Sequence, residues 1–239
     1  VLELARWGIT EPEDLRWVDL PPTAHIEQAR SLLRWLGALD ESGRLTRHGE
    51  AMAMLPTHPR LAHMLVLAGQ RGRAGLAAEV AAVLEEATPL EMRNEADFTV
   101  RLRYFQSGQW QGSDRGWGQR VKLQAKRYAA LLKNNPNDAP LDTSELLALA
   151  FPDRIGQRRS ERDAVYRLSG GGSASFRRDD SVANSEYVVV AELDGKARES
   201  RIYSAVPIKH VQLEALFADQ LQWHDRVDWD RQTEAMIAV

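Results

Sequence analysis

The stretch LALAFPDRIGQRR, residues 147–159, decides the fold because the character of the chain changes within it. Before it, apolar residues recur at the three- and four-residue spacing of helices, and after it come short β-branched or alternating segments. Phe151-Pro152 ends the last helix, because proline disfavours helical geometry in the preceding residue. We predict helices from residue 59 to residue 151, apart from a glycine-rich loop, and a change to strands between residues 149 and 164.

Downstream of this stretch we expect a small β-barrel. The candidate strands cover residues 164–168, 174–178, 186–193 and 197–206, and Asp194-Gly195 between the last two is typical of a hairpin turn. Apolar residues at helical spacing predict a helix over residues 209–221 that packs on the barrel. The last residues, 225–239, are expected to form a further hairpin that the end of the chain truncates.

Upstream, the helical section divides into segments with separate apolar stripes. Residues 61–68, 75–87, 98–105 and 143–151 form helices, and residues 107–118, with four glycines, read as a mobile loop or a disordered insertion. A basic helix is predicted over residues 119–134, with Val121, Ala125, Tyr128 and Leu132 as its buried stripe. Pro59 opens the first of these helices, at the position where its missing amide proton costs nothing.

Residues 21–58 predict a winged helix. Pro21-Pro22 breaks regular structure, and Thr23 caps a helix that Gly37 ends. A tight ribbon follows, and Thr46 caps the next helix. Helix, small hairpin and helix within about 35 residues form the winged-helix pattern.

Composition indicates an ordinary globular protein. The 239 residues carry 31 Lys+Arg and 34 Asp+Glu, a net charge of −3, and 44% of them are hydrophobic. No apolar run approaches the ~20 residues of a membrane helix. The absence of cysteine removes disulfides, thiol catalysis and thiolate metal sites, and it is consistent with a cytoplasmic protein, which we expect. Because Val1 opens directly into an apolar run, we also expect a piece of a longer protein.

Although the net charge is close to zero, the sequence contains two strongly basic segments. Residues 115–134 hold six basic residues and no acid, and residues 153–178 hold seven basic residues and three acids. Local charge of this kind is typical of phosphate contacts, although a solvated helix face explains either segment equally well.

Most catalytic chemistry is excluded. No G-x-x-x-x-G-K-[ST] loop, H-E-x-x-H pair or G-x-S-x-G elbow occurs. We therefore assign no catalytic residue, no metal ligand and no cofactor to the chain itself. Trp7, Trp17 and Trp35 lie among apolar residues, and we expect them in the core or between domains.

The candidate binding residues are basic. On the predicted basic helix, Lys122, Lys126 and Lys133 share one face, opposite the apolar stripe, and Arg120 and Arg127 share the next. Three arginines follow where the helices meet the barrel: Arg154, Arg158 and Arg159. Arginine offers forked donors for phosphate oxygens and a flat face for bases, and small barrels commonly bind single strands. The competing interpretation of each arginine is an interdomain salt bridge.

Several motifs carry a family resemblance. LRWVDLPP at residues 15–22 resembles the exit from the second RecA-like domain of DExH-box helicases, and residues 36–49 and 52–65 resemble their winged helix and its continuation. Together with residues 147–159 and VVAELDG at residues 189–195, the chain is similar to the bacterial HrpB-type ATP-dependent RNA helicases. The last two motifs are the specific ones, and the resemblance runs essentially end to end.

The resemblance implies an α+β multidomain fold and a function. The expected parts are the tail of a motor domain (1–20), the winged helix (21–58), a ratchet-like helical bundle (59–151), an OB-fold-like barrel with its helix (152–222) and the start of a C-terminal region (223–239). The chain would be an accessory region that binds and guides single-stranded RNA, or single-stranded DNA, against its own RecA-like motor domains. ATP and Mg²⁺, and the NTP hydrolase activity of the parent helicase, would belong to those motor domains, and no membrane is involved.

Two other classes stay open at this point. One is a winged-helix regulator that reads duplex DNA, although residues 47–54 offer few polar side chains for base edges. The other is a protein-interaction scaffold that uses the acidic regions outside the two basic segments.

Overall fold

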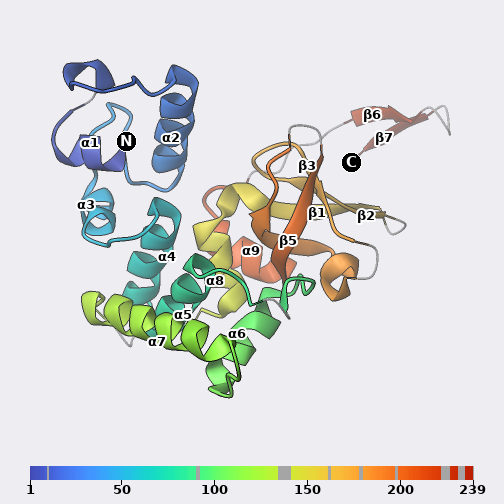
Figure 1. Cartoon of the computed structure of the whole chain (residues 1–239). Coiled ribbons are helices and arrows are strands. Elements are labelled where there is room, and N and C mark those ends of the chain that lie inside the picture. The colour runs from blue at the N-terminus through green and yellow to red at the C-terminus, as the bar shows by residue number, and fades with distance from the viewer. Residues whose placement is uncertain are drawn as a thin grey trace. The chain divides into compact units, whose positions relative to one another are not determined.

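The computed structural model describes residues 1–9, 11–89, 92–133, 141–160, 163–177, 180–196 and 199–221, and the backbone of residues 227–230 and 235–238. The chain divides into two compact units, Val1–Ile208 and Lys209–Val239. The first unit contains a winged helix, a helical bundle and a barrel in the expected order (Figure 1). Every helix in the described part of the chain is too short or too polar to cross a membrane.

The winged helix consists of two helices around a short ribbon. Its helices are α2 (Thr23–Trp35) and α3 (Arg47–Ala53), and Leu39 pairs with Leu45 across the ribbon. The Thr46 hydroxyl caps α3 as predicted, because it accepts a hydrogen bond from the Gly49 amide at 2.9 Å. Thr23 does not cap α2: Pro22 holds that place, and its side chain has no acceptor.

The residues before the winged helix pack onto it. They form α1 (Leu2–Arg6) and the 3₁₀ turn η1 (Pro12–Asp14). Leu2 and Leu4 are buried, and the Arg6 guanidinium donates to the Ala53 carbonyl at 3.3 Å. Helix α1 is therefore held against α3.

The bundle is built from helices whose small residues allow close packing. Its members are α4 (Pro59–Gln70), α5 (Ala74–Glu85), α6 (Phe98–Ser107), α7 (Asp114–Leu131) and α8 (Thr143–Ala150). Pro59 occupies the first turn of α4, as predicted. Five alanines and two valines of α5 are fully or almost fully buried, and α5 packs against α4, α7 and α8.

The barrel is closed by five strands in the order β1-β2-β3-β5-β4. The strands are β1 (Ile155–Ser160), β2 (Asp163–Leu168), β3 (Ser173–Ser175), β4 (Tyr187–Leu193) and β5 (Glu199–Ile208), with the 3₁₀ turn η4 (Ser181–Asn184) before β4. Neighbours pair antiparallel except β3 with β5. This is the five-stranded topology expected of an OB-fold-like barrel. Its core contains Tyr166, whose hydroxyl donates to the Ser185 carbonyl at 2.6 Å.

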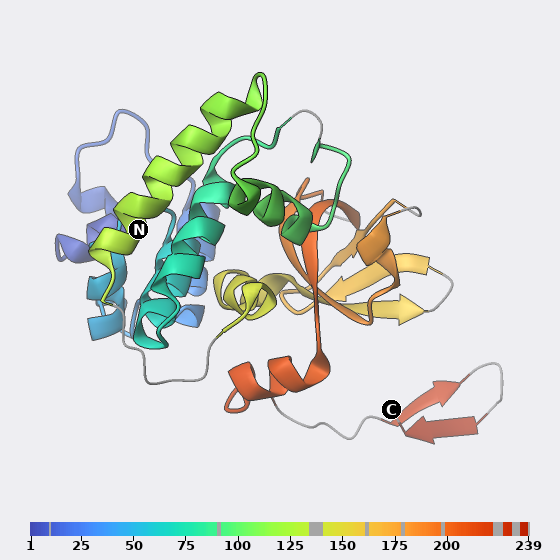
Figure 2. The ribbon, with the colours of Figure 1, turned by 90° about the horizontal axis from the view of Figure 1, so that it is seen from below.

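The joint between bundle and barrel is tied at two places. At the first, Arg60 of α4 forms a two-pronged ion pair with Asp153 of the 3₁₀ turn η3 (Pro152–Arg154). At the second, Arg101 of α6 pairs with Glu192 of β4 at 2.6 Å, and the Ala205 amide donates to the Ala96 carbonyl at 2.8 Å. Helix α8 packs on α4 and α5 and also on β4 and β5, so it lies between the helices and the barrel (Figure 2).

The second unit contains a helix and a hairpin. Helix α9 (His210–Phe217) falls within the predicted 209–221 segment, and β6 (Val227–Asp230) pairs antiparallel with β7 (Ala235–Ala238), which confirms a hairpin there. The packing of this helix on the barrel stays a prediction.

The helix-to-strand change falls at residues 151–155, inside the predicted interval. Three details of the prediction were wrong. Helix α7 begins at Asp114, so Gly116 and Gly118 are helical rather than part of a loop. The described residues 86–89 and 92–97 are largely irregular rather than helical, and Asp97 bridges to Ala205 of the barrel. The run after Arg154 is itself a strand, β1, whose sequence IGQRRS lacks the β-branched or alternating apolar residues by which the other strands were predicted.

Candidate nucleic-acid interface

Helix α7 presents the first group of predicted basic residues. Its buried stripe contains Val121, Ala125 and Tyr128, as expected, and extends back to Trp117. Leu132, the fourth predicted member, follows the last residue of the helix and is only half-buried. This stripe packs on α5, and the Tyr128 hydroxyl is hydrogen-bonded to the Glu85 carboxylate. The basic residues are exposed, and they fall on the two flanks of the helix rather than on one row.

One flank contains Lys122 and Lys126, four residues apart. Neither ammonium group forms a hydrogen bond or an ion pair with another described residue. Lys133 lies beyond the end of α7 and does not extend this row. The opposite flank contains Arg120 and Arg127. Arg120 forms an ion pair with Glu86, Nε to Oε2 at 2.9 Å, so only part of its charge is available to a ligand.

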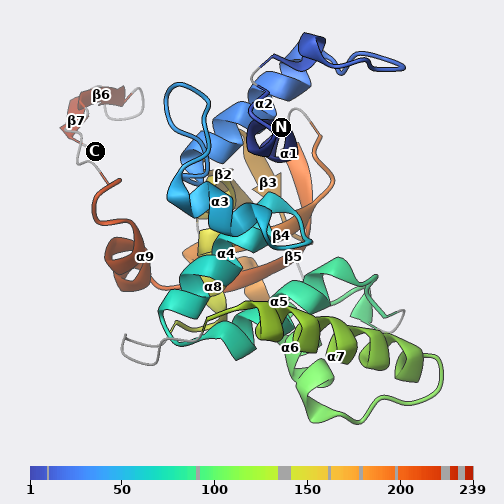
Figure 3. The ribbon, with the colours of Figure 1, turned by 90° about the vertical axis from the view of Figure 1, so that its left-hand side faces the viewer.

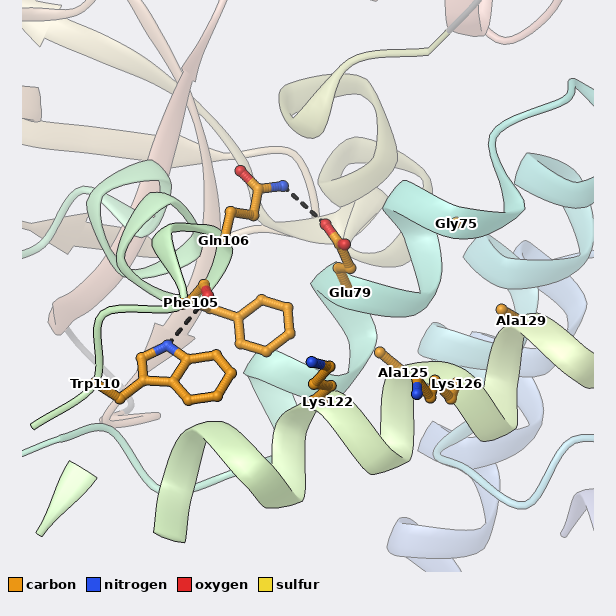
Figure 4. A pocket seen from close by; sticks show the side chains of 10 residues that line it. Gly75, Glu79, Phe105, Gln106, Trp110, Lys122, Ala125, Lys126 and Ala129 are labelled. Atoms are coloured by element: carbon orange, nitrogen blue, oxygen red, sulfur yellow. Dashed lines mark hydrogen bonds between the residues drawn. The ribbon is translucent and has the colours of Figure 1, made fainter. Parts of the chain in front are cut away.

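A cleft of about 350 Å³ opens beside the lysine flank, between α5, α6 and α7 (Figure 4). We call it the lysine cleft. Phe105 and Trp110 stand at one end, Lys122 and Lys126 along one side, and Glu79 with Gln106 on the other. The Gln106 amide donates to Glu79 Oε2 at 2.8 Å, which leaves Oε1 without a partner among the described residues.

The aromatic end of the lysine cleft is rigid. The Phe105 and Trp110 rings stack with centroids 5.7 Å apart and planes 9° apart. The Trp110 indole N–H donates to the carbonyls of Tyr104 and Phe105 at 3.3 and 3.1 Å. Gly118 lies against the indole so closely that a methyl group there would overlap it. The fourth glycine of the predicted loop, Gly118, therefore provides room for this ring within a helix.

Arg154, predicted at the bundle–barrel junction, is half-buried and bonded to the protein itself. Its guanidinium donates to the Ala191 carbonyl at 3.0 Å and lies 5.1 Å from the centre of the Phe151 ring. Burial lowers the pKa of Arg154, and nearby Arg60 adds to the effect. These contacts favour the structural interpretation for this residue.

Arg158 and Arg159 are neighbours on β1 with different environments. The Arg158 guanidinium donates to the Asp163 carbonyl at 3.2 Å and to the carbonyl and side-chain oxygens of Asn184 at 3.2 and 3.4 Å. Arg159 is exposed, and it contacts no hydrogen-bonding or acidic group among the described residues. Of the three junction arginines, Arg159 is the one whose charge is most available.

The two basic groups do not form one continuous row. Helix α7 packs along α5, on the side of the bundle away from the barrel, and β1 belongs to the barrel itself (Figures 1 and 2). A single row of phosphate contacts from α7 to β1 is therefore not what the fold provides. The structure offers two separate basic surfaces.

Sequence reasoning missed an aromatic residue on the outer face of the barrel. Tyr203 of β5 is 45% exposed, and the Arg201 guanidinium lies 5.5 Å from its ring centre. A cavity of about 350 Å³ beside it is lined by Tyr203, Arg93 and Arg101 together with two glutamates. The signal that was available is the alternation of Arg201 and Tyr203 with buried residues along a strand, which turns both outward.

A partly buried histidine pair connects the winged helix to the bundle. His48 Nε2 and His63 Nδ1 are 2.8 Å apart, and burial lowers the pKa of His63 from 6.5 to about 3. Two histidines do not make a metal site alone, and among the described residues no group of three or more potential metal ligands exists.

Apolar side chains are exposed on the N-terminal part of the first unit. Trp7, Trp17 and Trp35 are 66%, 40% and 44% exposed, so the expectation that they belong to the core is wrong. Val18, Leu20 and Met54 are exposed in the same region (Figure 3 shows this end of the chain uppermost). The alternative expectation, contact with another domain, is the one left open.

Comparison with known proteins gives one family model and several relatives. The model of the helicase-associated domain (HA2), winged-helix, matches residues 29–57. The ATP-dependent RNA helicase HrpB of Escherichia coli is 35% identical over 232 residues, which is 96% of this chain and 27% of that protein. A probable ATP-dependent RNA helicase of Saccharomyces cerevisiae is 36% identical over 72 residues, 30% of this chain and 10% of its own length.

Solved structures agree with these matches. A crystal structure of the E. coli DExH-box NTPase HrpB superposes with a TM-score of 0.76 at 32% identity, and covers 99% of this chain and 28% of its own. A second, of the E. coli DEAH/RHA helicase HrpB, gives a TM-score of 0.72 at 26% identity with the same coverage. The chain thus spans little more than a quarter of the length of the relatives that it matches end to end.

Proposed function

We propose, from the homology of this chain to one region of the HrpB-type DExH-box helicases, that it is the accessory region of an ATP-dependent RNA helicase and that it binds and guides single-stranded RNA. The observation that carries the proposal is the alignment over 96% of the chain with E. coli HrpB. A winged-helix match alone would fit many other proteins. ATP and Mg²⁺ would be bound by the motor domains of such a helicase, since the sequence here contains no phosphate loop.

The charges of the exposed basic residues support strand binding. Lys122, Lys126 and Arg127 on α7 and Arg159 on β1 are exposed, and none is neutralised by an acid among the described residues. Cations held in this way neutralise phosphates without reading bases, which suits a protein that guides any sequence. Arg120 would contribute less because of Glu86, and Arg154 would act only through the shape of the joint.

The exposed apolar surface supports a partner domain. Trp7, Trp35 and Met54 are large side chains that would bury considerable area against another protein surface. The longer relatives contain about three quarters of their length outside the region matched here. We propose that RecA-like motor domains of the same polypeptide cover these side chains and complete the channel for the strand.

The duplex-DNA alternative receives little support from α3, the helix that would enter a major groove. His48 is engaged with His63, and the remaining exposed side chains include alanine and methionine. Only Arg47 and Glu50 are left as long polar groups toward solvent, fewer than base-edge recognition normally uses.

Competition binding separates these classes. The chain is titrated into fluorescently labelled single-stranded RNA, and unlabelled single strands or duplexes of several sequences compete. The proposal expects displacement by any single strand and poor displacement by duplex, with affinity that falls as salt rises. Displacement by one duplex sequence alone would establish the regulator instead, and no binding of either would leave the scaffold as the remaining class.

A further inference from the structure

The lysine cleft complements each part of a nucleotide: an apolar wall for the flat base, a hydrogen-bonding edge for its polar atoms and positive charge for the phosphate. Its volume of about 350 Å³ lies at the small end of the range for ligand sites, ~300–1,000 Å³. Phe105, Trp110 and Ala125 form the apolar wall. A flat ring of one or two fused cycles suits this space better than a flexible chain does.

The apolar wall of the cleft is held in place by contacts within the protein itself. Two hydrogen bonds and the contact with Gly118 hold the Trp110 indole, and Phe105 is stacked on it. A binding surface that is already ordered loses little side-chain entropy when it captures a ligand. Aromatic side chains fixed in this way are the usual platforms for bases of single strands.

The polar side of the cleft distinguishes between bases. Glu79 Oε1 is an acceptor with no partner among the described residues, since Gln106 donates only to Oε2. A carboxylate accepts hydrogen bonds and donates none, so it pairs with an exocyclic amino group such as N4 of cytosine. Uracil carries a carbonyl oxygen at the same ring position, which a carboxylate repels.

The lysine side of the cleft provides positive charge for the phosphates of the strand. Lys122 and Lys126 follow the cleft along one flank of α7, one helical turn apart (Figure 4). Both ammonium groups are exposed beside the cavity, and neither is neutralised by another described residue. A base seated in the cleft would leave its flanking phosphates within reach of these two groups.

From these features we infer that the lysine cleft binds one nucleotide of a single strand and prefers a base with an exocyclic amino group. Glu79 accepts from the amino group, Phe105 and Trp110 contact the ring, and Lys122 and Lys126 neutralise the phosphates. This inference rests on the proposed single-strand function, and it adds a base-selective position on the side of the bundle away from the barrel.

The test compares short labelled oligomers of cytidine and of uridine by fluorescence anisotropy with the 239-residue chain. We expect the cytidine oligomer to bind about fivefold or more tightly than the uridine oligomer, the lower bound for one good base contact. Glu79→Ala should abolish this preference and leave the affinity for the uridine oligomer unchanged or slightly higher. Equal affinity of the unaltered chain for both oligomers overturns the inference.

Blocking the cleft provides an independent arm. A Cβ at Gly75 meets no atom within 4 Å, and Gly75 lines the cleft, so the side chain of Gly75→Leu starts in open space there and narrows the cleft. We expect this variant to bind the cytidine oligomer about fivefold more weakly and to lose the base preference. Gly75→Ala is the matched control and should retain both.

Charge removal completes the design. Lys122→Ala/Lys126→Ala should weaken binding of both oligomers, because these groups contact the phosphates, whereas Arg120→Ala/Arg127→Ala, with the same charge removed from the opposite flank, should weaken it less. A preference that survives Glu79→Ala and Gly75→Leu overturns the inference and leaves the proposed function intact. If the chain binds neither oligomer, both the inference and the proposed function fail.

Discussion

Replacing Arg158 and Arg159 separately distinguishes an RNA contact from a structural one. The two residues are adjacent on β1 and carry the same charge, but Arg158 donates to Asp163 and Asn184, whereas Arg159 extends into solvent. Each is changed to alanine alone in the chain. We expect Arg159→Ala to affect strand binding and Arg158→Ala to affect stability.

The magnitudes follow from the contacts. Loss of one phosphate contact reduces the slope of log affinity against log salt by about 0.7 for single strands. When the salt concentration rises fourfold, the affinity of the unaltered chain for single-stranded RNA should therefore fall by a factor about 2.6 times larger than that of Arg159→Ala. Arg158→Ala removes hydrogen bonds at a partly exposed site, so we expect a loss of about 1–2 kcal/mol. In a chain of this length that lowers Tm by roughly 2–4 °C per kcal/mol.

The assays are anisotropy titrations of single-stranded RNA at several salt concentrations and thermal unfolding of the same preparations. The reasoning is refuted if Arg158→Ala flattens the salt slope while Tm stays constant, or if Arg159→Ala lowers Tm and leaves the slope unchanged.

Three further outcomes are expected. The isolated chain should release no phosphate from ATP above background, with or without RNA, because its sequence has no phosphate loop; RNA-stimulated release in a colorimetric phosphate assay would contradict this. Gly118→Ala should lower the free energy of unfolding by about 1–3 kcal/mol in urea titrations, since the methyl group overlaps the Trp110 ring. Gly116→Ala, whose Cβ is 3.5 Å from Arg120, is the control and should be neutral or stabilising by up to about 1 kcal/mol. The pKa of His63 is lowered to about 3, so this side chain stays neutral in the folded chain, whereas in the unfolded chain it takes up a proton near pH 6.5. The free energy of unfolding should therefore fall as pH drops below about 6.5, by at most about 1.4 kcal/mol per pH unit. Urea titrations of His63→Gln should show a weaker fall.

Local rules predicted the elements whose causes lie within a few residues. Thr46 caps α3 through a group three positions away, and Pro59 opens α4 by its own ring geometry. The stripe of Val121, Ala125 and Tyr128 follows from helical periodicity alone. These are cases where the neighbouring sequence contains the whole physical reason.

The errors concern causes that are distant in the chain. Glycine is a poor helix former, so Gly118 was assigned to a loop, yet its place in α7 depends on the packing of Trp110. For Arg154, the sequence could not indicate its acceptor, the Ala191 carbonyl, which lies 37 residues further on, and its contact with RNA stays a prediction. The exposed tryptophans show the same limit, since an apolar residue indicates burial without indicating which surface covers it.

The two ties at the joint have a mechanical consequence. A single link between bundle and barrel would leave the barrel free to swing, but Arg60–Asp153 and the group around Ala96 and Ala205 hold it at two separate points, with α8 packed between. We therefore expect the bundle and the barrel to move together when a load is applied to the helices. A ligand in contact with both would then meet one rigid surface rather than two independent ones.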